Sequence, residues 1–384
     1  MTRVDDPSDT GTPAPTRVTG LDGIRGLAAL YVLLHHCWLL SFSGYPENTG
    51  PWALGWLVYG RFAVVLFIAL SGFSLAISPA ARGWRLGGRA RYIGRRARRI
   101  LPAYWAALAL SLVLAWAFAP QPLSDPPDTR TAVVYGLLLQ DVVVAPVPNA
   151  ALWSIAVEAW LYVAFPLLLL IRRRLGAVAV LAAVTVPVVA LGLLFPEATD
   201  GRSTGYTVEL APLFTVGLVA AGVLAAGERV RGLPWHWLAL LALVPVVVLI
   251  AVQGSVWTAH HFYWIDLALG PAIAAFLAAV ATGRPRPLAR LLDSRPVRGL
   301  GRFSYSLYLI HVPIAVLVSR RLVAPLAAPG LPAFLLTLAV AVPVCLVAAR
   351  LFSAAFEWPF QRLGRRGAAK PVAAREPAVV GPPS

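Results

Sequence analysis

Long apolar segments recur along this chain and limit it to one class of fold. Hydrophobic residues make up 59% of the sequence and charged residues 13%, and the mean hydropathy is +0.73. Runs of about 18 or more apolar residues are typical of membrane-spanning helices. The sequence therefore predicts an all-α, polytopic integral-membrane bundle. The candidate segments lie at about 21–42, 55–78, 101–119, 132–147, 151–171, 176–195, 208–226, 235–252, 262–282, 302–320 and 332–356.

The arginines between these segments predict the topology, because positive charge concentrates in cytoplasmic loops. Residues 79–100 carry eight arginines, residues 172–174 three and residues 283–302 six. If 132–150 crossed the membrane fully, the triplet at 172–174 would lie outside. We therefore interpret 132–150 as a re-entrant or interfacial segment on the outer side. The prediction is about ten spans with both termini cytoplasmic.

The remaining composition excludes several classes of protein. The formal net charge of +16 does not indicate nucleic-acid binding, because the arginines lie at the ends of apolar spans. Cys37 and Cys345 both lie in apolar segments and offer neither a disulfide framework nor metal-ligand spacing. No metal and no bound cofactor are expected. The predicted organisation is a disordered lead at 1–19, a membrane domain at 20–364 and a disordered tail at 365–384.

The first span carries charged and titratable groups that membrane spans seldom contain. Such groups mostly face a bundle interior or a water-filled cavity. Arg25 and His36 are eleven positions apart, which places them within about 20° of one helix face and about 16 Å apart along the axis. One stripe of this helix is thus expected to carry a guanidinium near the cytoplasmic face, held by Asp22, and an imidazole in the outer half.

A carboxylate in the fourth span is predicted to lie level with this imidazole. Glu158 is about seven residues, or about 10 Å, below the outer end of its span, a depth similar to that of His36. A carboxylate beside an imidazole fixes its tautomer and raises its basicity, as a general base requires. His36 and Glu158 are therefore the predicted catalytic pair, and a structural buried pair is the alternative. His35 faces about 100° away and is expected to pack.

Two polar elements are expected near the cytoplasmic face. Ser71, in the motif ALSGF, is a candidate substrate or oxyanion residue, although Ser-Gly in a span also permits close helix approach. Arg98 and Arg99 end a run of arginines before Pro102, which suits the first turn of the next helix. Guanidinium groups there can bind phosphates bidentately. Ordinary positive-inside charge is the alternative.

The ninth span places three polar residues on one helical stripe. Ser304, Tyr308 and His311 are spaced by four and then three positions, so they share a face. Tyr308 and His311 are further candidates for substrate or oxyanion contacts, and a structural, hydrogen-bonded histidine is the alternative for His311. Glu209 and Asp266, at the outer ends of their spans, could line the mouth of an acceptor site.

Six of these segments together resemble the membrane acyltransferase-3 family, whose members transfer acyl groups, commonly acetyl, from acyl-CoA to sugar hydroxyls. The segments occur in the family's order over about residues 19–364. The resemblance implies ten spans with both termini cytoplasmic, and it implies functional roles for Arg25, His36 and Glu158. The matching segments are LDGIRGLAALYVLLHH, ALSGF, RRARRILPAYW, LWSIAVE, SYSLYLIHVP and FEWPFQRL.

The sequence thus predicts an integral-membrane O-acyltransferase of a bacterial plasma membrane. Its co-substrate would be acyl-CoA, in the first place acetyl-CoA, held by Arg25 together with Arg98 or Arg99. Its acceptor would be a carbohydrate-type hydroxyl. The sequence does not choose between direct transfer and an acyl-His36 intermediate, and it predicts no oligomeric state. Two alternatives are a cytoplasmic-side tailoring enzyme for a natural product and a glycan transporter or flippase, which would often show inverted repeats that this sequence lacks.

Overall fold

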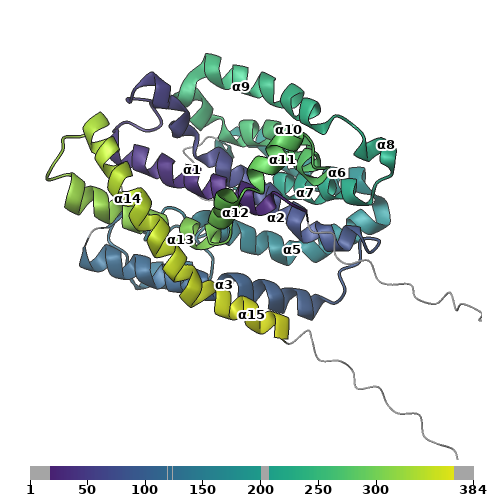
Figure 1. Ribbon diagram of the computed structural model, residues 1–384, viewed down its shortest axis with the longest axis horizontal. Coiled ribbons are helices and arrows are strands. Elements are labelled where there is room, and N and C mark those ends of the chain that lie inside the picture. Colours follow the sequence, from purple (N-terminus) through teal and green to yellow (C-terminus); the bar gives the residue numbers. More distant parts are fainter. Residues whose placement is uncertain (1–17, 119, 123, 200–206, 367–384) are drawn as a thin grey trace, which may run out of the picture.

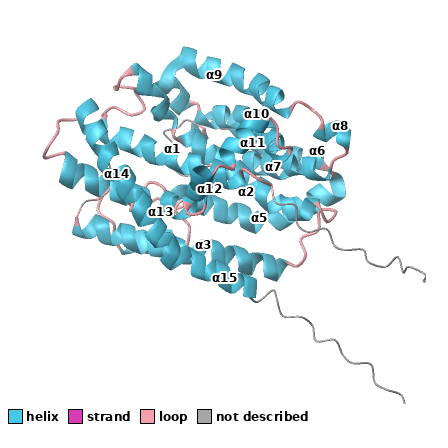
Figure 2. Cartoon of the chain, in the orientation of Figure 1, coloured by secondary structure: helices cyan, strands magenta, loops and turns pink. Residues whose placement is uncertain are grey.

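The computed structural model describes residues 18–118, 120–122, 124–199 and 207–366. Within these residues the chain is helical and contains no β-strand (Figure 2). This confirms the predicted all-α bundle. The expected disordered lead and tail lie outside the described residues, apart from their innermost positions.

Nine helices of the described chain are long and apolar enough to cross a membrane. A tenth apolar helix, Leu210–Ala225, is shorter and lies where the sixth span was expected. Each of the ten predicted spans therefore has a helical counterpart. The nine longer helices are Leu21–Ser41, Trp52–Ala80, Arg89–Ala117, Trp153–Leu175, Ala177–Leu194, Trp235–His260, Phe262–Ala281, Ser304–Val323 and Leu331–Arg362.

The individual elements follow one another with short connections (Figure 1). The long helices are α1 (Leu21–Ser41), α2 (Arg61–Ala80), α3 (Arg89–Ala117), α5 (Trp153–Leu175), α6 (Ala177–Leu194), α7 (Leu210–Ala220), α9 (Trp235–His260), α10 (Phe262–Ala281), α13 (Ser304–Val318) and α14 (Leu331–Phe352). The short α-helices are α4 (Thr129–Gly136), α8 (Glu228–Arg231), α11 (Arg286–Leu292), α12 (Arg295–Gly301) and α15 (Trp358–Arg366). The 3₁₀ and π turns are η1 (Trp52–Tyr59), η2 (Pro196–Ala198), η3 (Ala221–Ala225), η4 (Ser319–Val323) and η5 (Ser353–Glu357).

Helix α1 occupies the middle of the bundle. It contacts α2, α12, α13 and α14, and in Figure 1 it lies between α9 above and α3 below. Its buried side chains include Leu33 and Trp38, which are fully enclosed. At the other extreme, α9 lies at the edge of the bundle, and only 6% of its most apolar stretch is buried within the protein. A helix that is apolar all round and unburied by protein suits contact with lipid. The central position of α1 brings its polar stripe into the interior.

Helices α2 and α7 approach each other at two glycines. A Cβ atom on Gly72 would lie 2.0 Å from the carbonyl oxygen of Phe214, and one on Gly217 would lie 1.8 Å from that of Ala69. Small residues permit such backbone contact in membrane bundles, where lipid offers no hydrophobic drive for helices to associate. The expectation that Ser-Gly in this span permits close approach is therefore confirmed. The contact fixes the rotation of α2 and so the direction of its polar face.

The segment between α3 and α5 does not form a crossing helix, in agreement with the prediction. The only α-helix among its described residues, α4, has eight residues and begins at a capping box formed by Asp128 and Thr131. The backbone that follows is bonded by side chains of neighbouring spans: Tyr104 Oη donates to Tyr135 O at 2.7 Å, and Trp160 Nε1 donates to Leu138 O at 3.1 Å. Irregular backbone in a membrane bundle requires such partners. These bonds place the start of α5 beside the central helices.

Helix α3 begins earlier than the sequence predicted. It starts at Arg89, so Pro102 lies inside the helix and not in its first turn. Proline removes one intrahelical hydrogen bond, but tertiary packing can maintain the helix across it. The arginine run is consequently a helical surface, on which residues three positions apart face the same way. That geometry decides which of the arginines reach the interior.

Candidate active site

Two cavities lie along α1, one toward each end of the helix. The first has a volume of about 460 Å³ and is called here the Arg25 cavity. Its polar lining comprises Asp22, Arg25, Ser71, Ser74, Arg96, Arg99, Ser154, Glu158, Tyr162, Arg302, Ser304, Tyr305, Tyr308, Glu357 and Gln361. The second has a volume of about 190 Å³ and is called the His36 cavity. Its lining comprises Val32, His35, His36, Tyr45, Gly60, Arg61, Val64, Ala150, Ala151, Trp153, Phe262 and Tyr308.

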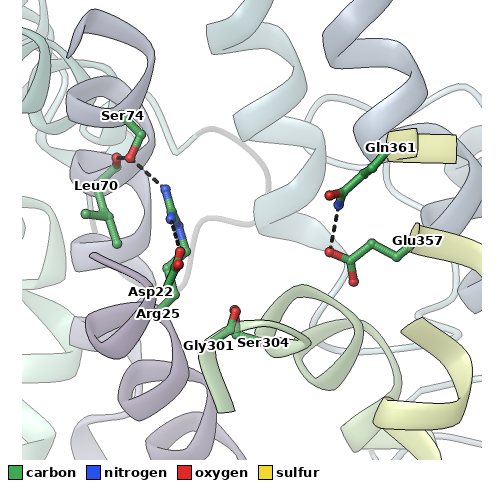
Figure 3. A network of polar contacts seen from close by, with 8 residues as sticks. All are labelled: Asp22, Arg25, Leu70, Ser74, Gly301, Ser304, Glu357 and Gln361. Atoms are coloured by element: carbon green, nitrogen blue, oxygen red, sulfur yellow. Dashed lines mark hydrogen bonds and ion pairs between the residues drawn. The ribbon is translucent and has the colours of Figure 1, made fainter. Parts of the chain in front are cut away.

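In the Arg25 cavity, the guanidinium is held in a fixed direction by two helices. Arg25 donates to Asp22 Oδ1 at 3.2 Å on its own helix and to Ser74 Oγ at 2.6 Å on α2. The expected role of Asp22 as the partner of Arg25 is confirmed. Figure 3 shows this group on one wall of the cavity, with Glu357 and Gln361 on the opposite wall. The guanidinium, held between Asp22 and Ser74, therefore borders the cavity.

Helix α3 adds two further arginines to this cavity, and they are not the pair that the sequence predicted. Arg96 and Arg99 line it, three positions apart on one helical face. Arg98 is exposed and folds back onto its own helix, where its Nε donates to Gly94 O at 3.0 Å. Arg98 does not line the cavity, because residues 98 and 99 on one helix face about 100° apart. Arg99 lies where it was expected.

Glu158 also lies in the Arg25 cavity, away from His36. Its Oε1 accepts a hydrogen bond from Tyr162 Oη at 2.5 Å and another from the hydroxyl of Ser71. No hydrogen bond or ion pair joins Glu158 to His36 in the described part of the chain. The predicted carboxylate–imidazole pair therefore does not form. Helix rise predicts the depth of Glu158 along the membrane, but it leaves the rotation and the lateral position of α5 undetermined. The candidate Ser71 is likewise a partner of Glu158.

His36 pairs with a second histidine. Its Nδ1 lies 2.9 Å from Val32 O and 3.2 Å from Nε2 of His311. Nδ1 of His311 lies 2.8 Å from Tyr308 O, so this nitrogen carries a proton, because a carbonyl only accepts. In a neutral His311 the Nε2 atom is then the acceptor.

The tautomer of His36 follows from these contacts. Its Nδ1–H donates to Val32 O and to Nε2 of His311, which leaves the lone pair on its own Nε2 available. His311, which is fully buried, thus takes the position beside His36 at which the sequence predicted Glu158. His35 packs as expected: its Nδ1 lies 2.6 Å from Leu57 O, and its ring fills the space over Gly60.

The two cavities share a wall formed by Val64 and Tyr308, which line both. The hydroxyl of Tyr308 lies 2.6 Å from that of Ser154, on the side of the Arg25 cavity. Tyr308 is therefore the only candidate of the sequence that borders both cavities within the described chain. Tyr308 thus lies at the boundary between the two cavities.

Arg61, which was not among the residues predicted from the sequence, lines the His36 cavity and forms two ion pairs. Its Nε donates to Asp266 Oδ2 at 2.8 Å and its terminal nitrogen to Glu209 Oε1 at 2.6 Å. Glu209 and Asp266 were expected to line the mouth of an acceptor site, but neither lines this cavity; both are instead bonded to Arg61. An arginine at the start of a long apolar run, with two acids in other spans, was the available signal. Only the folded bundle brings the three together, because they are far apart in sequence.

The family model described as an acyltransferase domain matches residues 18–350 of the chain. The putative peptidoglycan O-acetyltransferase YrhL of Bacillus subtilis is 27% identical over 326 residues, which cover 78% of this chain and 49% of that protein. The O-acetyltransferase OatA of Staphylococcus aureus is 24% identical over 333 residues, covering 80% and 52%. The peptidoglycan O-acetyltransferase OatA of Listeria monocytogenes is 23% identical over 326 residues, covering 79% and 50%.

The chain spans about half the length of these curated relatives. No solved structure matches it significantly. The apolar helices and the bacterial relatives identify a multi-pass bacterial membrane protein. With the family model matched from the residues before α1 to the last turn of α14, the chain belongs to the membrane acyltransferase-3 family.

Proposed function

We propose that the chain transfers an acyl group, in the first place acetyl, from acyl-CoA to a hydroxyl of a carbohydrate acceptor. One observation carries the proposal. A single central helix links a cavity lined by arginines to a histidine with an available Nε2 lone pair. Arg25 and His36 are about 16 Å apart along the helix axis, a distance comparable to the reach of an extended acyl-pantetheine arm. The names of the relatives support an O-acetyltransferase and a peptidoglycan-type acceptor.

The donor would bind in the Arg25 cavity. Guanidinium groups bind phosphate oxygens bidentately and remain charged, and Arg25, Arg96 and Arg99 all line this space. The positive-inside rule places the arginine-rich end of α3 at the cytoplasm, where acyl-CoA is made. Glu158 would act here, by positioning the hydroxyls of Ser71 and Tyr162, and not as the partner of the catalytic base.

The transfer step would use His36 as a general base. Its Nε2 would take the proton of the acceptor hydroxyl while the oxygen attacks the thioester carbonyl. The C–O bond forms, the C–S bond breaks, and the proton passes from His36 to the leaving thiolate. Tyr308, at the wall between the cavities, could donate to the oxyanion once its hydroxyl leaves Ser154. In the alternative route, Nε2 of His36 attacks the thioester and the C–S bond breaks with release of the CoA thiolate. The acceptor hydroxyl then attacks the acyl-imidazole, the N–C bond breaks, and the hydroxyl proton passes to the thiolate.

Acyl transfer by the purified full chain in lipid nanodiscs tests the proposal. We expect radiolabel from [14C]acetyl-CoA to appear on a chitooligosaccharide or on soluble peptidoglycan fragments. The substitution His36→Ala should lower this transfer by about 10²-fold or more, the usual contribution of a general base. His236→Gln, which alters a histidine that lines neither cavity, is the matched control.

Two results would contradict the proposal. Full transfer by His36→Ala would remove the histidine from the chemistry, and transfer that requires a donor other than acyl-CoA would reassign the Arg25 cavity. Acid quenching of the wild-type reaction before acceptor is added separates the two routes. Label retained on the protein, and lost in His36→Ala, would indicate an acyl-histidine intermediate.

A further inference from the structure

Arg61 is the arginine that lines the His36 cavity, and its ion pairs with Glu209 and Asp266 neutralise its charge. The guanidinium is bonded to Glu209 and Asp266, whose side chains are 5% and 0% exposed, whereas 19% of the arginine side chain remains exposed. Two ion pairs occupy two of the five N–H donors of arginine, so others can serve a ligand. The acids hold Arg61 from behind, and the arginine faces the cavity.

The charge around Arg61 does not favour an anion. Two carboxylates face one guanidinium, and Asp141, in the irregular segment after α4, adds a third nearby acid. Burial raises the pKa of Asp141 and so favours its neutral form, which leaves Glu209 and Asp266 as the carboxylates that offset the charge of Arg61. A cluster in which acids outnumber the base repels a negatively charged ligand. The free donors of Arg61 therefore suit neutral oxygen acceptors such as hydroxyl and carbonyl groups.

Aromatic rings form the rest of this site. Trp153 and Phe262 lie against the guanidinium of Arg61, with ring centroids 5.5 Å and 5.0 Å from its Cζ. Both rings line the cavity, together with Tyr45 from the loop after α1. Binding sites for small molecules commonly combine aromatic walls with a few well-placed polar groups. Flat apolar walls beside hydrogen-bond donors match the two faces of a sugar ring, which carries C–H groups on its flat sides and hydroxyls on its rim.

The size of the cavity restricts what can enter. Its volume of about 190 Å³ lies below the range of about 300–1,000 Å³ that is usual for sites of drug-sized ligands. One pyranose ring is a better match than a longer stretch of glycan. His36 lines the same cavity as Arg61 and Trp153. A ring held by these two residues would thus present a hydroxyl close to the Nε2 atom of the base.

We propose that the His36 cavity is the acceptor site and that it binds a single uncharged sugar ring, through hydrogen bonds from Arg61 and stacking on Trp153. This inference rests on the proposed acyltransferase function for its purpose, but the binding itself does not require the donor. Arg61 is a specificity-determining residue in this site, and Glu209 and Asp266 position it. The acceptor would carry its acidic groups, where it has any, on rings or substituents outside the cavity.

Binding of a neutral and an acidic trisaccharide to the full chain in nanodiscs tests the proposal without acyl-CoA. The probes are chitotriose and trigalacturonate, titrated by saturation-transfer NMR. We expect wild-type protein to bind chitotriose more tightly than trigalacturonate by about tenfold or more. Loss of a charge-assisted hydrogen bond should weaken chitotriose binding about tenfold or more in Arg61→Gln. Trp153→Leu should weaken it about three- to tenfold by removing the aromatic face.

The single substitution of Arg61 leaves two buried carboxylates without their cation and can prevent folding. The double variant Arg61→Gln/Asp266→Asn removes one charge of each sign and keeps the net charge of the three side chains unchanged. It should fold, retain acetyl-CoA binding and still lose chitotriose binding about tenfold or more. Arg130→Gln is the matched control, because this exposed arginine lines neither cavity.

Three results would overturn the proposal: no chitotriose binding by wild-type protein, equal or tighter binding of trigalacturonate, or unchanged chitotriose binding by the folded double variant. These outcomes differ from failure of the proposed function. If acetyl transfer from acetyl-CoA were absent but Arg61-dependent binding of chitotriose persisted, the donor assignment would be wrong and the sugar site would stand.

Discussion

Nε2 of His311, a fully buried residue, lies 3.2 Å from Nδ1 of His36, which is partly buried on a neighbouring helix. The carbonyl oxygens beside Nδ1 of His311 require that nitrogen to carry a proton. The backbone carbonyls of α13 thus fix the tautomer of His311, and this tautomer makes its Nε2 the acceptor for Nδ1–H of His36. If His36 acts as the proposed base, this pair orients it without placing a carboxylate charge beside it.

His311→Ala should slow acyl transfer while leaving donor binding unchanged. Nδ1–H of His36 would lose one of its two acceptors, and the ring could rotate away from the acceptor hydroxyl. We expect kcat to fall about tenfold or more, a part of the 10²–10⁴-fold that a general base contributes. Steady-state kinetics with acetyl-CoA and chitotriose would measure this. His311→Gln, whose amide oxygen can accept from His36, should recover part of the rate, and equal losses in both variants would argue against the orienting role.

The two arginines at 98 and 99 should differ in their effect on the donor. Arg99→Gln should raise the KM for acetyl-CoA about tenfold, because a charge-assisted hydrogen bond to phosphate contributes about 1.5–3 kcal/mol. Arg98→Gln should change this KM less than twofold, since its side chain does not line the Arg25 cavity and is bonded to Gly94 O. Each variant removes one positive charge, so the two differ only in the position of the lost charge. Equal effects would indicate that surface charge, and not the Arg25 cavity, attracts the donor.

Glu158→Ala should lower the stability of the protein and raise its KM for acetyl-CoA more than Glu158→Gln does. The alanine leaves the hydroxyls of Ser71 and Tyr162 without their common acceptor, at a cost of about 1–3 kcal/mol for each buried polar group. The glutamine keeps one oxygen that can accept. The measurements are thermal inactivation in nanodiscs and the KM for acetyl-CoA. Neither variant should alter the binding of chitotriose; a loss confined to chitotriose would restore the pairing of Glu158 with His36.

Gly72→Ala should destabilise the bundle by separating α2 from α7. The added Cβ would lie 2.0 Å from Phe214 O, which is backbone and cannot move aside alone. We expect a loss of about 1–3 kcal/mol, as for other overpacked contacts, measured as a lower temperature of thermal inactivation. Gly299→Ala is the control, since nothing lies within 4 Å of its added Cβ. Similar stability of the two variants would show that α2 and α7 can part without cost.

The spans and their order could be predicted from the sequence because each depends on local composition. Apolar length identifies a membrane helix, and the arginine loops predict the alternation of its ends. The same local rules predicted that α1 carries Arg25 and His36 on one stripe, and that 132–150 does not cross as a helix. Ser71 and Gly72 show how one short motif serves twice, since the glycine packs on α7 while the serine bonds Glu158.

The partners of these residues could not be predicted in the same way. The depth of Glu158 follows from helix rise, but its neighbours depend on how α5 is rotated against α2 and α13, which packing across the bundle decides. The replacement of Arg98 by Arg96 as a cavity residue follows from the early start of α3, where tertiary contacts maintain a helix through Pro102. Arg61 joins Glu209 and Asp266 only when α2, α7 and α10 pack together.

The sequence by itself thus determined the class of fold, the family resemblance and most of the polar residues that matter, because hydropathy, charge and helical period are properties of a single segment. The tertiary structure alone decided which of these residues share a cavity. It separated Glu158 from His36, paired His36 with His311 and placed Arg61 in the same cavity as His36. Contacts between helices depend on rotation and lateral packing, and a span's own sequence leaves both undetermined.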